Sequence, residues 1–108
     1  MAADRRASAL TNGIIDQIYR KGGYAWRASS VGVFDVAQQR HRAAAKKGVA
    51  DVLACYKGRL VAIEVKIGTD KLTDEQAGFL ENVRHAGGVA FVATDLLQFQ
   101  EEWARLLE

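Results

Sequence analysis

Hydrophobic residues recur along the chain with two different periods, and each period predicts one type of element. A pair of glycines ends each of the first two helical patterns. The helical spacing covers residues 8–21, 73–86 and 96–107, and short apolar runs predict strands at 24–33, 49–56, 59–67 and 89–94. The resulting order αβββαβα predicts a single α/β domain with a mixed four-stranded sheet flanked by helices.

Two segments lack such a pattern. Residues 1–6 are polar, and we expect them to be frayed. Residues 34–47 show no clear periodicity, and we expect a long, mobile, basic connection of the kind that orders when substrate binds.

The central stretch, residues 48–68, reads GVADVLACYKGRLVAIEVKIG. Its two apolar runs are separated only by a Lys-Gly turn, and glycine tolerates the positive φ that a two-residue hairpin turn requires. Such a turn also sets the register of the hairpin. Leu53 then faces Ala62, and Asp51 faces Glu64, so that two carboxylates become cross-strand neighbours.

This pair of carboxylates predicts a cation site. Like charges directly opposite each other destabilise a sheet, and a divalent cation would remove the repulsion. Side chains alternate faces along a strand, so Glu64 and Lys66 point the same way and converge with Asp51 on one patch.

A Glu-x-Lys sequence on a strand more often marks a solvated face. The neighbours of the charged residues oppose that interpretation, because Leu53, Cys55, Leu60 and Ala62 would share their face. We therefore expect the hairpin to be covered on both faces, with Cys55, the only cysteine, as a small core residue.

Five segments carry a resemblance to a known family. They are GGYAWR at 22–27, GVAD at 48–51, IEVK at 63–66, LTDEQ at 72–76 and GGVAFVA at 87–93. Together they resemble the virus-type replication-repair nuclease (VRR-NUC) domain of the PD-(D/E)xK nuclease superfamily, which is related to Holliday junction resolvases. The resemblance covers most of the chain.

The resemblance implies a restriction-endonuclease-like αβββαβ core and a Mg²⁺- or Mn²⁺-dependent endonuclease that hydrolyses DNA phosphodiester bonds. Branched DNA such as a Holliday junction would be the substrate, and DNA repair in a bacterium or phage would be the setting. A nucleic-acid-binding module that keeps this fold without catalysis is the alternative.

The motifs of the family also imply roles for individual residues. Asp51, Glu64 and the backbone carbonyl of Val65 would bind the metal, Lys66 would orient the attacking water, and Gln76 would support the lysine. Gln76 also follows Thr73 by three residues, the spacing of a capping box, so a purely structural role is the alternative.

Two positions differ from the family pattern. Ala50 stands where a proline often precedes the first acid, and Ala7 aligns near the position of a glutamate in the first helix. Asn12 and Asp16 are the two candidates to replace that glutamate.

Positive charge is concentrated just before the hairpin. The net charge is only +2, but RHRAAAKK at residues 40–47 contains four fixed positive charges and no acid. A solvated loop and a phosphate-binding segment explain this run equally well. We expect Trp26 to be a core residue and Arg27 to contact phosphate. The candidate nucleic-acid-binding residues are Arg27, Ser29, Arg40, Arg42, Lys46 and Lys47.

Composition narrows the class of protein. The chain has 108 residues, 49% hydrophobic and 26% charged, which suits one globular domain. No run of eighteen apolar residues is present, and the first residues lack the apolar core of a signal peptide, so we expect a cytoplasmic protein. The last helix has an apolar stripe of Phe99, Trp103, Leu106 and Leu107, which together with the two cuts that a junction requires predicts a homodimer.

Overall fold

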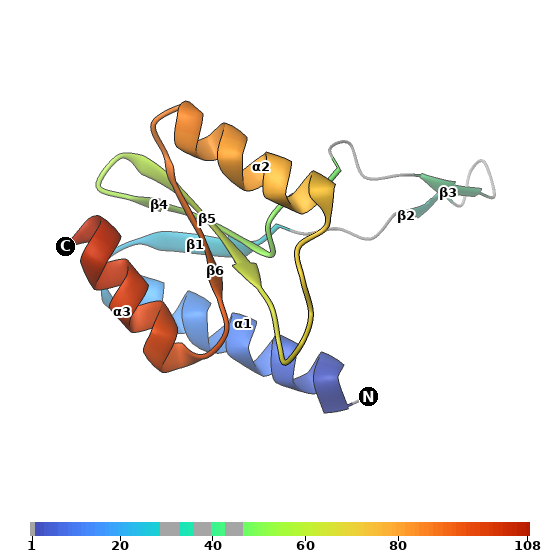
Figure 1. The fold of residues 1–108 in the computed structure, drawn as a ribbon, viewed down its shortest axis with the longest axis horizontal. Helices are drawn as coiled ribbons and strands as arrows, with labels where there is room; N and C mark the ends of the chain where they lie inside the picture. Colours follow the sequence, from blue (N-terminus) through green and yellow to red (C-terminus); the bar gives the residue numbers. More distant parts are fainter. Residues whose placement is uncertain (1, 29–32, 36–39, 43–46) are drawn as a thin grey trace.

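The structure is a computed structural model that describes residues 2–28, 33–35, 40–42 and 47–108. Figure 1 shows its helices and strands in chain order. They are α1 (Ala2–Arg20), β1 (Tyr24–Arg27), β2 (Val33–Asp35), β3 (Arg40–Arg42), β4 (Val52–Tyr56), β5 (Arg59–Val65), α2 (Asp74–His85), β6 (Val89–Ala93) and α3 (Leu96–Leu107).

The predicted mixed four-stranded sheet is confirmed. Its strand order is β1-β4-β5-β6, with the first two pairings antiparallel and the β5–β6 pairing parallel. Helix α2 makes the crossover between the two parallel strands, as such a connection requires. β5 therefore lies inside the sheet, with a hydrogen-bonded neighbour on each side.

The hairpin of β4 and β5 has the predicted register. Leu53 pairs with Ala62 and Tyr56 pairs with Arg59. Lys57 and Gly58 both have positive φ, 50° and 80°, which is the conformation of a type I′ turn. This turn matches the natural twist of the two strands and leaves no freedom for the register to slip.

Helices cover the two faces of the sheet unequally. In Figure 1, α2 lies on one side of the sheet, and α1 and α3 lie on the other. The side of α1 and α3 holds the larger hydrophobic cluster, which includes fully buried Ile14, Ile63, Phe99 and Trp103. The side of α2 holds a smaller cluster, in which Leu80 and Val83 pack on the small residues Ala50, Ala62 and Ala90.

This unequal cover contradicts two expectations. Cys55 is exposed instead of buried, and the side chain of Trp26 is 40% exposed. Both residues lie on the α2 side of the sheet, where the short helix α2 packs over β5 and β6 and leaves the outer part of β1 and β4 open.

The apolar stripe of α3 was expected to support a homodimer. Phe99 and Trp103 are fully buried in the core, and Leu106 and Leu107 are partly buried against the same cluster. The stripe is therefore used mainly in the core of one subunit.

Several element boundaries differ from the predicted ones, and β4 and β5 are each shorter than expected. α1 begins at Ala2 and not at residue 8, because alanine and arginine favour the helix even without an apolar stripe. β1 ends at Arg27, and the segment predicted to lack structure contains a pair of short antiparallel strands, β2 and β3. These two strands form a sheet of their own, drawn away from the main sheet in Figure 1. Within the described ranges no helix is both long and apolar enough to cross a membrane.

Gly48, in the loop before β4, lies in close contact with the start of α2. Its φ is +74°, and a Cβ atom at this position would lie only 2.3 Å from the carbonyl oxygen of Glu75. The loop that leads into β4 thus touches the backbone of the first turn of α2.

We expect Gly48→Ala to destabilise the protein more than Gly58→Ala. Both glycines have positive φ, which costs about 1–2 kcal/mol for a residue with a side chain, but an added Cβ at Gly58 meets no atom within 4 Å. The clash at Gly48 should add about 1–3 kcal/mol to that cost. Urea denaturation of the two variants measures the difference, and equal losses would show that the loop does not depend on this close contact.

Candidate active site

Asp51 lies directly before β4 and is held by backbone groups on two sides. Its Oδ2 accepts a hydrogen bond of 2.7 Å from the Val65 N–H, and its carbonyl accepts one of 2.9 Å from the Ala28 N–H. The ladder of β4 and β5 ends at the pair Val52 and Ile63, so the next pair in the same register is Asp51 and Glu64. The carboxylate of Asp51 is therefore fixed beside the end of β5.

Glu64 is one of the most deeply buried side chains of the protein. It is 2% exposed, and within the described part of the chain its Oε2 has no hydrogen-bond partner. Burial raises its pKa to about 9, with smaller increases from a hydrogen bond to Asp51 and from the charge of Asp51. A buried carboxylate of this kind is stable only as the neutral acid or beside a compensating positive charge.

Lys66 supplies part of that positive charge. Its proximity opposes the increase in the pKa of Glu64, as expected for an ammonium group on the same face two residues along the chain. Its N–H donates to the Ala93 carbonyl at 3.0 Å, which continues the parallel pairing just beyond the end of β5. The backbone of Lys66 is thus fixed, while its side chain is only partly buried.

The carbonyl of Val65 points toward the same place. In a sheet, the N–H and C=O of one residue face the same neighbouring strand. Because the Val65 N–H donates to the Asp51 side chain, the Val65 C=O also faces the side of Asp51. Oxygen atoms from three groups, two carboxylates and one carbonyl, are therefore available at the end of β5.

These oxygen atoms fit a small divalent cation. Mg²⁺ is usually held by one or two carboxylates and keeps several water molecules. The unpartnered Oε2 of Glu64 provides a site-specific reason for such an ion, since a cation would compensate both its charge and its missing hydrogen bond. Among the described residues no group of three or more His, Cys, Asp or Glu side chains gathers around a possible metal position.

The two candidates for the missing glutamate of the first helix have other partners. Asn12 Oδ1 accepts a hydrogen bond of 2.9 Å from Arg27, and Asp16 forms a 3.0 Å ion pair with Arg20. Asp16 is also exposed. Neither side chain extends the carboxylate pair to a third acidic ligand.

Gln76 forms the capping box that the sequence predicts. Its N–H donates to the Thr73 hydroxyl at 3.1 Å, and its Oε1 accepts from the Thr73 N–H at 2.9 Å. The first turn of α2 is therefore fixed next to Gly48. A supporting role of Gln76 toward Lys66 stays a prediction.

Only some of the predicted nucleic-acid-binding residues lie in the described part of the chain. Lys47 is exposed immediately before Gly48, and Arg40 and Arg42 lie in β3. Ser29 and Lys46 lie outside the described residues. Arg27 lies on the α1 side of β1, where its Nη2 donates to the Ser8 carbonyl, the Ser8 hydroxyl and Asn12 Oδ1 at 2.9–3.1 Å.

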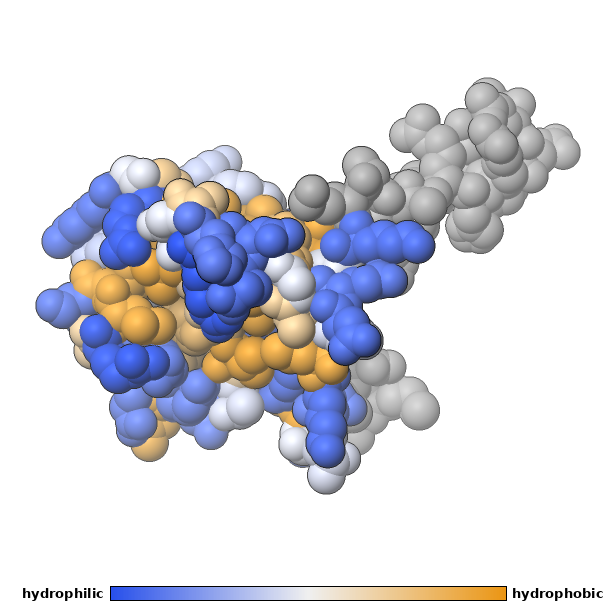
Figure 2. All heavy atoms as spheres, turned by 45° about the horizontal axis from the view of Figure 1, so that its top comes forward, coloured by the Kyte–Doolittle hydropathy of each residue, from blue (hydrophilic) through white to orange (hydrophobic). Residues whose placement is uncertain are grey.

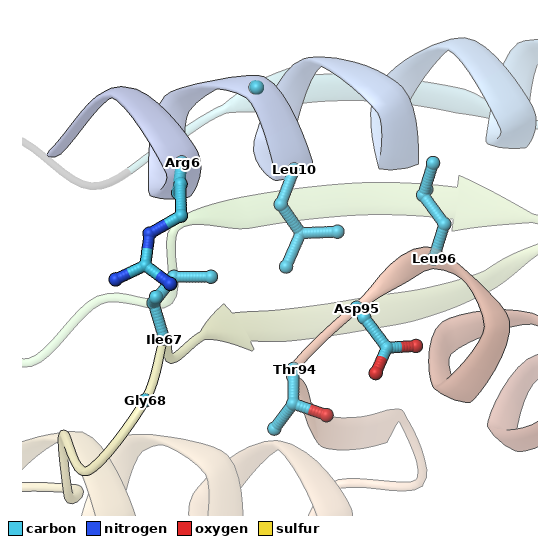
Figure 3. A pocket seen from close by; sticks show the side chains of 8 residues that line it. Arg6, Leu10, Ile67, Gly68, Thr94, Asp95 and Leu96 are labelled. Atoms are coloured by element: carbon cyan, nitrogen blue, oxygen red, sulfur yellow. The ribbon is translucent and has the colours of Figure 1, made fainter. Parts of the chain in front are cut away.

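A pocket lies away from this site. Figure 3 shows a cavity of about 430 Å³ between the first half of α1, the turn after β5 and the start of α3. Arg6 and Leu10 border it from α1, and Asp95 and Leu96 border it from α3. Neither Asp51 nor Glu64 lines this pocket. It is a gap between packed helices, with Arg6 on one side and Asp95 on the other.

A comparison with solved structures shows a similar fold. Hjc of Archaeoglobus fulgidus, a Holliday junction resolvase from an archaeal hyperthermophile, matches with a TM-score of 0.57 and 22% sequence identity over 82% of this chain and 68% of that chain. The fold is therefore restriction-endonuclease-like, as the resemblance implied. No protein-family model and no curated protein sequence matches this chain.

We expect the stability of the metal-free protein to fall between pH 5 and pH 8 because of Glu64. Its pKa is higher in the folded than in the unfolded state, so the folded protein binds more protons and loses stability as the pH rises toward 9. One carboxyl group contributes at most about 1.4 kcal/mol per pH unit. Glu64→Gln cannot titrate and should show a flatter profile. Urea denaturation in EDTA measures both profiles, and parallel profiles would mean that Glu64 ionises normally.

We expect Mn²⁺ to raise the melting temperature through Asp51 and Glu64. An ion that binds only the folded protein stabilises it. At a free-ion concentration about a hundred times its Kd, it should raise the melting temperature by about 10 °C. Asp51→Asn should abolish this shift. Asp70→Asn is the matched control, because Asp70 is exposed in the turn after β5. An undiminished shift in Asp51→Asn would place the ion elsewhere.

Proposed function

We propose that this chain is a Mg²⁺- or Mn²⁺-dependent endonuclease of the VRR-NUC type that hydrolyses phosphodiester bonds in branched DNA. The main support is the pairing of Asp51 with the buried Glu64 beside Lys66, in which one Glu64 oxygen has no hydrogen-bond partner among the described residues. A second support is the fold, which resembles that of a Holliday junction resolvase.

The residues of the pair have distinct roles in this proposal. Asp51, Glu64 and the Val65 carbonyl would hold the ion, with Asp51 kept in position by the Val65 N–H. A bound divalent ion supplies a Lewis acid that neutralises charge on the phosphate and lowers the pKa of a bound water. Glu64 is rigid because β4 and β6 pair with its strand on both sides.

Lys66 would act on the attacking water. Its ammonium group carries hydrogen-bond donors and a positive charge beside Glu64, which suits it to hold a water molecule and to stabilise the hydroxide that forms from it. Gln76 would support this lysine from the first turn of α2, in addition to capping that helix.

Basic residues that precede Asp51 in the chain would hold the DNA backbone. Lys47 lies four residues before Asp51, and β3 contributes Arg40 and Arg42 to the same basic run. Arg27 can still donate from its other guanidinium nitrogens, although its Nη2 is bound to α1. Ser29 and Lys46 complete the proposed set.

The homodimer is a proposal that rests on symmetry. One domain of this size offers one site, and cutting two strands of a junction is most simply done by two sites related by a two-fold axis. The α3 stripe gives no support, because the core uses it.

A second candidate function is a nucleic-acid-binding module without catalysis. The absence of a third acidic side chain near Asp51 and Glu64, within the part of the chain that the structure describes, favours this alternative. Cleavage assays separate the two functions.

We expect Asp51→Ala, Glu64→Ala and Lys66→Ala each to reduce cleavage of a four-way DNA junction at least about a hundredfold in Mn²⁺, the usual scale for losing one electrostatic or acid-base contribution. Asp70→Ala should retain full activity, since its exposed side chain lies outside the carboxylate pair. Thermal melts show whether each variant is folded. Full activity in a folded variant of the triad would remove that residue from the mechanism.

The cleavage assay also tests the substrate preference, and light scattering tests the oligomeric state. A junction should be cut faster than a linear duplex of the same sequence, with nicks placed symmetrically on two strands, and light scattering should give twice the 11.8 kDa mass of one chain. A monomer that cuts both substrates equally would contradict both parts. A folded protein that binds DNA but cuts neither substrate in any metal would support the binding module.

A further inference from the structure

Two aromatic side chains are exposed on the edge strand β1. Tyr24 is 63% exposed and Trp26 is 40% exposed. Their ring centroids are 5.5 Å apart at an angle of 45°, and Tyr19 of α1 supports Tyr24 edge-on at 5.9 Å. Large aromatic rings are costly to leave in water, so a cluster of them in contact at the surface indicates a binding function.

The aromatic pair lies on the same face of the sheet as the candidate active site. Trp26 pairs with Leu53, and the same register places Ala28 beside Asp51. Since side chains alternate along a strand, Trp26, Leu53 and Asp51 share one face. Ala28, which lies beside Asp51, is two residues from Trp26 on the same strand, a distance of about 7 Å along the strand. This distance equals roughly two steps of a stacked nucleic-acid strand at 3.4 Å per nucleotide.

The surface that continues from the aromatic pair along β4 and β5 is apolar. Cys55 and Leu60, which pair with each other on β4 and β5, are exposed on this face, and Tyr24 pairs with Cys55. In the view of Figure 2, hydrophobic patches lie between hydrophilic side chains. An apolar and aromatic surface suits the flat faces of nucleobases.

We propose that Tyr24 and Trp26 form a stacking platform for unpaired bases of the nucleic-acid strand whose phosphate lies at Asp51, Glu64 and Lys66. This inference deepens the proposed function and rests on it for the position of the phosphate. Bases inside a duplex are covered on both sides by their neighbours, so only unpaired nucleotides can stack on the rings. The platform therefore selects substrates with unpaired nucleotides about two steps from the phosphate.

The test compares two oligonucleotides of equal charge. One is oligothymidylate, and the other is an abasic strand of the same length, which has the same phosphates but no bases. Binding is measured in EDTA by fluorescence anisotropy for the wild type, Trp26→Leu and Trp26→Phe. Leu97→Ser is the matched control, because Leu97 is an exposed apolar residue on α3, away from this face.

We expect the wild type to bind oligothymidylate at least about tenfold more tightly than the abasic strand, because stacking of one base on an aromatic ring increases the affinity by about this factor. Trp26→Leu should lose this preference without weakening the abasic complex, Trp26→Phe should retain most of it, and Leu97→Ser should match the wild type. Because Trp103 is fully buried, quenching of tryptophan emission by oligothymidylate should come from Trp26 and disappear in both Trp26 variants.

Several results would overturn the platform. Equal affinity of the wild type for the two strands, or no binding of either, would exclude base stacking. An equal loss for both strands in Trp26→Leu would indicate a structural role. A change from dimer to monomer in Trp26→Leu would identify the surface as a contact between two copies of the chain.

The binding assay also separates this inference from the proposed function. A protein that prefers bases through Trp26 but cuts no DNA would refute the nuclease and leave the platform. A protein that cuts DNA through Asp51, with equal KM for Trp26→Leu and the wild type, would refute the platform alone.

Discussion

The placement of Glu64 is the constraint on which the rest of this structure depends. A two-residue turn sets the register of the central hairpin, and that register puts Asp51 beside Glu64. Glu64 lies on a strand with neighbours on both sides and a helix above, so water does not solvate its carboxyl group. A carboxyl group buried in this way is stable as the neutral acid or beside a positive charge, and perturbed groups of this kind are frequent at functional sites.

The surrounding elements hold this pair in place at the level of the backbone. The Val65 N–H fixes the Asp51 side chain, and Gly48 brings the loop before Asp51 against the first turn of α2. That turn is itself fixed by the capping box of Thr73 and Gln76. Three segments distant in the sequence thus meet through backbone contacts and short side-chain hydrogen bonds to backbone N–H groups.

The unequal cover of the sheet explains why one of its faces is partly open to solvent. Two helices bury one face, while α2 packs on small residues over β5 and β6 and leaves the outer part of β1 and β4 open. The open part begins beside the carboxylate pair and ends at the hairpin turn. The pair therefore lies at the border between a covered and an open part of the sheet.

The sequence by itself determined the parts of this protein that depend on local rules. The Lys-Gly turn fixed the hairpin, alternation placed Glu64 and Lys66 on one face, and Thr73 with Gln76 predicted the start of α2. Only the tertiary structure decided the exposure of Cys55 and Trp26, because a strand pattern shows which residues share a face but not how far a helix covers it. Likewise, the apolar pattern of α3 gave its stripe, and only packing against the sheet showed that this stripe was already used.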